Sequence, residues 1–196
     1  VPKGTQGLST GNHENKMGIR TSSTTDVVME DVRVPASALL GKEGMGFMIA
    51  MKTLDESRAY VGAGAVGIAQ RAIDEAVKYS KQRVTFGKPI SNHQAIQFML
   101  ADMDIKTSTA RSMVAEAVLR QERKLPYAKE SAIAKCYAGD IAVQVALDAI
   151  QILGGYGYSR EYPVEKLLRD AKIFQIYEGT NQIQRMVIAK NVIKGK

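Results

Sequence analysis

Four short segments of the chain combine charged, aromatic and glycine residues in patterns that binding and catalytic sites use. They are residues 54–58 (LDESR), residues 83–90 (RVTFGKPI) followed by His93 and Gln94, residues 151–157 (QILGGYG) and residues 176–185 (IYEGTNQIQR). A guanidinium can bind phosphate through its fork of donors, glycines admit a close backbone approach, and a carboxylate can move a proton. These residue types point to an anionic ligand and to acid–base chemistry.

Each segment also has a structural interpretation when it is taken alone. Arg83 can be a solvated charge, Gly154 and Gly155 can end a helix, and Thr180 can cap the next helix. Glu178 can simply favour the positive end of that following helix. The residues by themselves leave both interpretations open for each segment.

Three other patterns have plain structural explanations. Residues 62–67 (GAGAVG) match G-x-G-x-x-G, but they lie inside a helical pattern and no acid follows about 20 residues on, so close helix packing is expected. His13 and His93 stand apart and no C-x-x-C occurs, so no metal site is expected. Cys136 falls on an apolar helical stripe and is expected to be a small buried side chain.

The composition of the 196 residues is that of a globular protein, with 45% hydrophobic and 24% charged residues. Lys and Arg exceed Asp and Glu by 27 − 20 = 7, which favours anionic ligands. The charges alternate in sign along the chain, however, so nucleic acid is not expected. No apolar run of roughly 18–20 residues predicts a membrane span, and neither a membrane span nor a signal peptide is expected.

Residues 1–25 are rich in Gly, Ser, Thr and Asn, and helical periodicity begins at Gly44. It predicts a helix over residues 47–81 and a second from Ser91 or Asn92 to just before Pro126. A third apolar stripe covers residues 133–153 and stops at Gly154, and shorter helices cover residues 163–173 and 180–193. The predicted fold class is therefore mainly α, an antiparallel bundle of four-helix type. Residues 26–35 predict one or two strands, which cannot form a stable sheet alone.

Together, and in this order along essentially the whole chain, the four segments resemble the acyl-CoA dehydrogenase family of flavoenzymes. Residues 17–22 (MGIRTS), 30–35 (EDVRVP) and 41–47 (GKEGMGF) are similar to the family's middle β-domain where it runs into the C-terminal helical domain. The resemblance implies a remnant of the β-domain at residues 1–42 and the helical bundle domain at residues 43–196. Family members carry about as much chain again before this point, so the chain is expected to be a C-terminal portion that is inactive alone.

The resemblance implies α,β-dehydrogenation of an acyl-CoA thioester with FAD as acceptor, as in fatty acid β-oxidation or branched-chain acyl-CoA oxidation. A base must take the weakly acidic α-proton while a hydride leaves the β-carbon for the flavin, and by similarity this base is Glu178. A carboxylate can do this if burial raises its pKa toward neutrality. Some relatives carry the base at the position of Ser57, which has no carboxylate here. The sequence therefore resembles the short-chain (butyryl-CoA dehydrogenase-like), medium-chain or branched-short-chain members more than the isovaleryl and long-chain types.

The same similarity assigns residues to the cofactor and the substrate. Arg83, Thr85 and Phe86 match a loop that reaches the FAD of a neighbouring subunit, with the guanidinium on the pyrophosphate. The other matches to FAD contacts are His93, Gln94, Gln151, Gly154, Gly155, Thr180 and Gln182. Matches to acyl-CoA contacts are Asp55, Arg58, Tyr177 as an aromatic wall, Gly179 as a residue small enough for close approach, and Lys190 in place of an arginine.

The resemblance further implies a homotetramer built as a dimer of dimers, and an electron-transferring flavoprotein as electron acceptor. It implies a location in the bacterial cytoplasm in preference to the mitochondrial matrix. Two alternatives stay open. An acyl-CoA oxidase-like enzyme would pass its electrons to oxygen and release hydrogen peroxide, and a non-catalytic helical assembly fragment would purify without the yellow colour of flavin.

Overall fold

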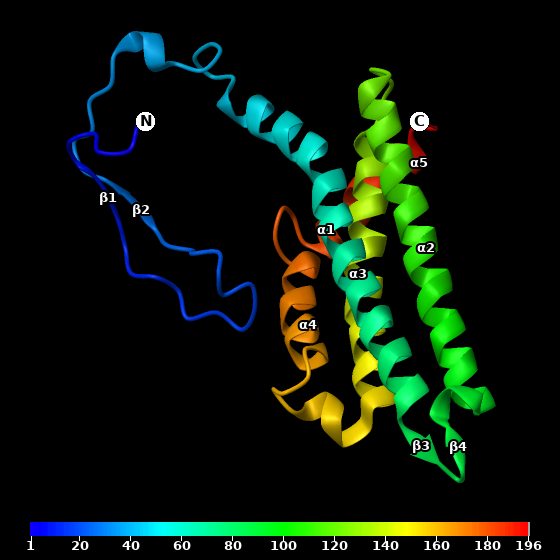
Figure 1. The fold of residues 1–196 in the computed structure, drawn as a ribbon. Helices are drawn as coiled ribbons and strands as arrows, with labels where there is room; N and C mark the ends of the chain where they lie inside the picture. The colour runs from blue at the N-terminus through cyan, green and yellow to red at the C-terminus, as the bar shows by residue number, and fades with distance from the viewer. Residues whose placement is uncertain (196) are drawn as a thin grey trace. The chain divides into compact units, whose positions relative to one another are not determined.

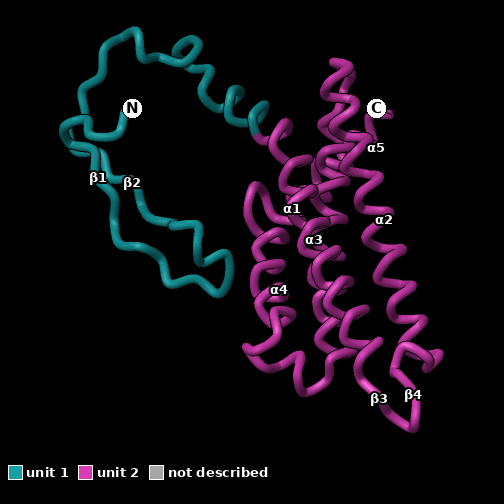
Figure 2. Tube along the Cα trace, in the orientation of Figure 1, with its two compact units in different colours: residues 1–53 teal, residues 54–196 magenta. Residues whose placement is uncertain are grey.

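The computed structural model describes residues 1–195 and divides into two compact units (Figure 2), Val1–Thr53 and Leu54–Lys196. The division falls inside helix α1 (Gly46–Gln82), so this one helix contributes to both units. The domain boundary expected after residue 42 stays a prediction.

The first unit contains little regular structure before α1. Strands β1 (Leu8–Thr10) and β2 (Val27–Met29) pair antiparallel, with Leu8 opposite Met29, and a single 3-10 turn η1 (Ala36–Ala38) follows. The strand expected over residues 26–35 is thus confined to its first apolar residues, all of which are exposed. A ribbon of two short strands is marginal in water because it has no second layer on which to bury a face.

The second unit is a helical bundle (Figure 1), which confirms the predicted mainly α fold. The remainder of α1 lies beside α2 (Gln94–Glu122) and α3 (Ala128–Leu153), followed by α4 (Val164–Ala171) and α5 (Asn181–Ile193). The connections between the long helices are short, which makes neighbours antiparallel. Helix α3 is central, because α2, α4 and α5 all pack against it.

Small residues allow the long helices to approach closely. A Cβ added at Gly62 would lie 3.0 Å from Val114 Cγ2 and 3.4 Å from the Ala134 carbonyl oxygen, and one added at Gly64 would lie 3.0 Å from the Phe174 ring. The packing role expected for the G-x-G-x-x-G segment is therefore confirmed for its first two glycines. The third, Gly67, faces open space.

The start of α2 differs from expectation. Helix α2 begins after His93, whose side chain makes no capping hydrogen bond, and residues 90–92 form the 3-10 turn η2 (Ile90–Asn92). The predicted caps Ser91 and Asn92 are therefore wrong, because that turn places them one step before the helix. Thr180 does cap α5, since its hydroxyl oxygen accepts the Ile183 N–H at 3.3 Å.

The central helix also corrects the expectation about membrane spans. The helical stretch Ala128–Tyr158 is long and apolar enough, by length and composition, to cross a membrane. However, 56% of its most apolar window is buried within the bundle, and the core helix of a bundle passes the same test. The Cys136 thiol on this helix is buried, as expected, and burial raises its pKa.

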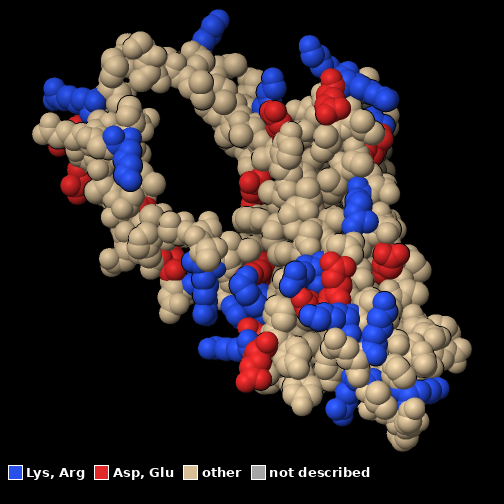
Figure 3. Space-filling model, viewed as in Figure 1, with Lys and Arg blue, Asp and Glu red and all other residues tan. Residues whose placement is uncertain are grey.

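On the face of the helical unit drawn in Figure 3, Lys and Arg side chains lie among Asp and Glu.

Candidate active site and cofactor pocket

The candidate base lies in a strained turn between α4 and α5. Glu178 has φ +54° and Gly179 has φ +86°, so two successive residues adopt the left-handed conformation. A residue other than glycine is uncommon there, and such strain costs about 1–3 kcal/mol and persists only where the surroundings impose it. The backbone at Glu178 is therefore held in place by the bundle, as an active site requires of a reacting group.

The carboxylate of Glu178 contacts Ser57, the other position at which relatives in the resembled family carry the base. The Ser57 hydroxyl, on α1 and 121 residues away in sequence, donates a hydrogen bond to Glu178 Oε2 at 2.5 Å. Both residues are half-buried. The structure therefore brings the two alternative base positions to one point, with a carboxylate from one side and a hydroxyl from the other.

Other predicted substrate residues surround this point. The Tyr177 ring packs edge-on against Phe174 with centroids 5.3 Å apart, and burial together with the charge of Glu178 raises the pKa of its phenol. Arg58 is buried and forms an ion pair with Asp55, one helical turn before it. The Arg58 Nε has no hydrogen-bond partner among residues 1–195. A buried guanidinium with a free donor can bind a further anionic or polar group.

Asp55 also lines a hollow in the helical unit. This cavity of about 620 Å³ carries both signs of charge and one phenol ring; it is lined by Asp55, Arg120, Pro126, Tyr127, Ala128, Lys129, Glu130 and Asn191. Lys190, the last predicted substrate residue, is exposed and is the chain neighbour of Asn191. No sequence pattern pointed to Arg120 or Lys129, because single basic residues on a helical surface are usually solvated.

A polar network fastens the start of α5 to the central helix. Asn181 donates to the Cys136 carbonyl at 3.0 Å and to Asp140 Oδ1 at 2.8 Å, and Arg185 donates to Asp140 Oδ2 at 2.7 Å. Although burial opposes the charge of Asp140, hydrogen bonds from Arg185, Asn181 and Gln175 hold the pKa of that carboxyl below its usual range. The network fixes where the turn containing Glu178 begins and ends.

The segment after α1 is a tight β-hairpin. Strands β3 (Val84–Thr85) and β4 (Lys88–Pro89) are joined by Phe86 and Gly87, both with positive φ, +51° and +76°. Positive φ at both central residues defines the type I′ turn that suits such hairpins. The Phe86 ring is 95% exposed and stands edge-on to His93, and Thr85 Oγ1 lies 3.0 Å from His93 Nε2. The hairpin thus presents the Phe86 ring to solvent at its tip.

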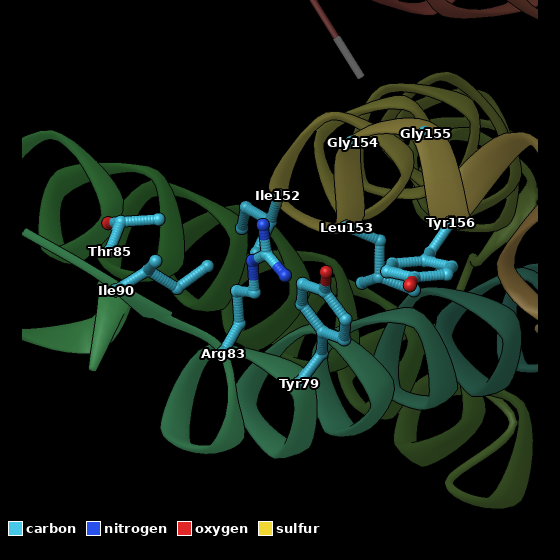
Figure 4. Close-up of a pocket in the computed structure, with 9 residues that line it drawn as sticks. All are labelled: Tyr79, Arg83, Thr85, Ile90, Ile152, Leu153, Gly154, Gly155 and Tyr156. Carbon is cyan, nitrogen blue, oxygen red and sulfur yellow. The ribbon is translucent and has the colours of Figure 1, made fainter. Parts of the chain in front are cut away.

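Four of the predicted cofactor residues meet in one pocket at this end of the bundle. Its volume is about 460 Å³, and it is lined by Tyr79, Arg83, Thr85, Ile90, Ile152, Leu153, Gly154, Gly155 and Tyr156. Arg83 lies in the middle of this group, with Thr85 and Ile90 to one side and Tyr79 and Tyr156 to the other (Figure 4).

The predicted cofactor residues divide between the two ends of the bundle. Gln151 precedes the glycines but is exposed outside the lining, as is Gln94. Thr180 and Gln182 lie at the other end, beside Glu178 in the chain. From Ser57 to Gln82 along α1 the rise is about 38 Å at 1.5 Å per residue, so the base and the Arg83 pocket are far apart within one chain.

The Arg83 pocket fits part of a dinucleotide. The guanidinium offers a fork of donors for phosphate, and the tyrosines Tyr79 and Tyr156 offer aromatic faces. Gly154 ends α3 with φ +61°, and a Cβ added at Gly154 or Gly155 would meet nothing within 4 Å, so the backbone there is open to a ligand. Residues 1–195 contain no group of three or more His, Cys, Asp or Glu side chains that could hold a metal ion.

Comparison with known proteins agrees with this geometry. The sequence profile described as "Acyl-CoA dehydrogenase, C-terminal domain" matches residues 44–193. An acryloyl-CoA reductase (NADH) from Anaerotignum propionicum is 53% identical over 194 residues, which are 99% of this chain and 49% of that protein. The structure of butyryl-CoA dehydrogenase from Megasphaera elsdenii is 51% identical, with a TM-score of 0.97 over 98% of this chain and 50% of that one.

A further solved structure is described as the electron transferring flavoprotein of Acidaminococcus fermentans, in a study of flavin-based electron bifurcation. A chain of that structure is 50% identical and has a TM-score of 0.98, over 99% of this chain and 51% of its own length. The present chain thus spans about half the length of the relatives that it matches.

Proposed function

Because this chain belongs to the acyl-CoA dehydrogenase family, we propose that it supplies the catalytic base for FAD-dependent α,β-dehydrogenation of an acyl-CoA thioester. One observation carries the proposal. Glu178, in a strained turn, accepts a hydrogen bond from Ser57, so a carboxylate occupies the point on which both base positions of the family resemblance converge.

In the proposed reaction Glu178 takes the proton from the α-carbon of the substrate. When bound, the flavin of FAD supplies the acceptor for the hydride from the β-carbon. The Ser57 hydroxyl donates to Oε2, and the other carboxylate oxygen is proposed to take the proton. The Tyr177 ring forms a wall beside the carboxylate, and the left-handed turn holds the base still, which lowers the entropic cost of reaching the reacting geometry.

The substrate is proposed to lie along α1 toward the charged hollow. Asp55, Arg58 and Lys190 are proposed acyl-CoA contacts, and the hollow that Asp55 lines offers two cationic side chains for phosphates, Arg120 and Lys129. The names of the Megasphaera and Anaerotignum relatives support a short acyl chain.

The cofactor is proposed to bridge two copies of this chain. Thr180 and Gln182 are proposed to contact the FAD that serves Glu178. The FAD of a neighbouring subunit is proposed to be contacted by the residues at the other end of the bundle: Arg83, Thr85, Phe86, His93, Gln94, Gln151, Gly154 and Gly155. The separation of about 38 Å along α1 supports this, because it places the two groups of residues at opposite ends of the same chain. A homo-oligomer, arranged as a dimer of dimers, follows as a proposal, with an electron-transferring flavoprotein as the acceptor that the Acidaminococcus structure suggests.

A second direction of the same reaction is favoured by one comparison. The Anaerotignum relative is named as an acryloyl-CoA reductase that uses NADH. Since a base that removes a proton also returns it in the reverse direction, protonated Glu178 would deliver a proton to the α-carbon during reduction. Measuring flavin reduction by acyl-CoA and flavin reoxidation by enoyl-CoA in the same preparation separates the two directions.

The test is substitution of the base in the flavin-loaded holoenzyme that contains this chain. Glu178→Gln keeps the shape but cannot accept the α-proton, so the rate of flavin bleaching on anaerobic mixing with acyl-CoA should fall about 10⁴-fold or more, the upper end for general-base catalysis. FAD content should stay nearly unchanged. Glu122→Gln, an exposed glutamate at the end of α2, is the matched control. Bleaching at a near wild-type rate by Glu178→Gln would show that the base lies elsewhere.

A further inference from the structure

Two completely buried polar side chains reach the backbone of the turn that carries Glu178. Lys135 on α3 and Gln184 on α5 are both 0% exposed. Lys135 Nζ donates to the Gly179 carbonyl at 2.8 Å, and Gln184 Nε2 donates to the same carbonyl at 2.9 Å and to the Glu178 carbonyl at 3.2 Å. Two helices that are far apart in sequence thus both bond to the Gly179 carbonyl, and Gln184 also bonds to the Glu178 carbonyl.

These contacts use both hydrogens of the Gln184 amide and both lone pairs of the Gly179 carbonyl. An amide nitrogen has two hydrogens, and Gln184 spends one on each carbonyl. The Gly179 carbonyl has two lone pairs, and Lys135 and Gln184 take one each. Both carbonyls therefore face the same buried amide, an arrangement that the left-handed φ at Glu178 and Gly179 makes possible.

We propose that Lys135 and Gln184 are positioning residues that act through the backbone of Glu178 and Gly179 to hold the base toward the substrate. The inference rests on the proposed function, because it assigns the purpose of the contacts to proton abstraction by Glu178. Neither side chain touches the reacting atoms. Their effect is to fix the turn in a conformation that a glutamate does not adopt by itself.

Gln184 buries an acceptor without a partner, which destabilises the fold and supports a role beyond packing. Its Oε1 is buried and has no hydrogen-bond partner among residues 1–195. Turning the amide over would not help, because Oε1 would then face two carbonyl oxygens. A side chain selected for stability alone would avoid an orphaned buried acceptor. The absence of a side chain at Gly179 leaves room for the same amide, since an added Cβ would lie 2.8 Å from Gln184 Nε2.

The lysine is held by a second partner that fixes its direction. Lys135 Nζ also donates to Asn181 Oδ1 at 2.9 Å, and Asn181 is tied in turn to Asp140. Burial, the largest influence, lowers the pKa of Lys135 to about 8, against the charges of Asp140 and Glu178, while Arg58 lowers it further. A neutral amine still has two N–H donors for its two acceptors, so the grip on the turn survives deprotonation.

The experiment uses single-turnover flavin reduction by acyl-CoA in the flavin-loaded holoenzyme, with variants Gln184→Met and Lys135→Met. The rate constant reports geometry in each competent molecule, whereas the amplitude reports how many molecules are folded. We expect each rate constant to fall about 10- to 100-fold, the scale of a misplacement near 1 Å, with FAD content retained. An α-deuterated substrate should show an isotope effect at least as large as in the wild type. Because both side chains share one acceptor, the double variant should lose less than the product of the single losses.

Thr107→Val is the matched control, since Thr107 is also completely buried but bonds only within α2, to the Met103 carbonyl. Its rate constant should equal that of the wild type. Rate constants within about threefold of the wild type for both methionine variants, with lower amplitude alone, would overturn the inference. Failure of both variants to yield flavin-loaded protein would also overturn it, by assigning them to folding. If the wild type fails to bleach, or if Glu178→Gln bleaches normally, the proposed function itself has failed instead.

Discussion

Moving the carboxylate from residue 178 to residue 57 should restore part of the activity that Glu178→Gln removes. The double variant Glu178→Gln with Ser57→Glu keeps one carboxylate at the point where the two side chains now meet. The amide that Glu178→Gln introduces can donate a hydrogen bond to the new carboxylate, which replaces the bond that Ser57 donates in the native protein.

The size of the recovery follows from side-chain reach. The carboxylate oxygen of a glutamate lies one carbon–carbon and one carbon–oxygen bond beyond the position of a serine oxygen, a reach of roughly 2.5 Å. Ser57 Oγ lies 2.5 Å from Glu178 Oε2, so the new carboxylate can arrive close to the native oxygen, although it approaches from α1. A misplacement near 1 Å costs about 100-fold. A loss of about 10⁴-fold should therefore shrink to about 10²-fold, a recovery of roughly 2.7 kcal/mol in activation free energy.

Anaerobic stopped-flow bleaching of the flavin, measured on all three variants with one acyl-CoA, decides the matter. Ser57→Glu alone is the informative control, because two carboxylates at one point repel and the pH profile of bleaching should move upward. A double variant that bleaches no faster than Glu178→Gln would refute the reasoning, since it would mean that residue 57 cannot present a base to the substrate.

Three further outcomes are expected. Arg83→Ala should weaken FAD retention and regain activity when FAD is added, because it removes a phosphate contact and no chemistry; unchanged FAD content after dialysis would contradict this. Gly139→Ala should destabilise the fold by about 1–3 kcal/mol, since its Cβ would lie 2.7 Å from the Phe174 carbonyl oxygen, whereas Gly67→Ala in open space should stabilise α1 by about 0.5–1 kcal/mol. Thermal unfolding that shifts both midpoints in the same direction would count against this packing. Below pH 8 Lys135 is charged in both the native and the unfolded state. As the pH rises from about 8 to 10.5, the ordinary pKa of a lysine, the native state loses this proton first. The free energy of unfolding should therefore rise over that range by up to about 3 kcal/mol relative to Lys135→Met, as measured by urea denaturation at several pH values.

The bundle was predictable from the sequence because its signals are local. Apolar residues at helical spacing define α1, α2 and α3, Gly154 ends α3 and Thr180 caps α5. The cap of α2 was predicted wrongly because a 3-10 turn uses the same Ser and Asn residues that a helix start prefers. The strand over residues 26–35 was predicted too long, since β propensity depends on neighbouring strands that local pattern does not contain.

The residues proposed for function divide in the same way. The motif residues Glu178 and Arg83 could be selected from sequence because their neighbours along the chain carry the signal. Lys135 and Gln184 could not, although a lysine in the apolar stripe of α3 is a weak signal. Their role depends on a carbonyl 44 residues away in one case and on a left-handed turn in the other.

The sequence by itself determined which helices form and which motifs belong together. Only the tertiary structure decided that Ser57 and Glu178, 121 residues apart, share one hydrogen bond. It also decided that Arg83 and Gly154 line one pocket at the opposite end of α1 from that base. The physical reason is that helix formation depends on neighbours within a few residues. A site depends on how distant segments pack, and the sequence pattern determines that packing only through the whole fold.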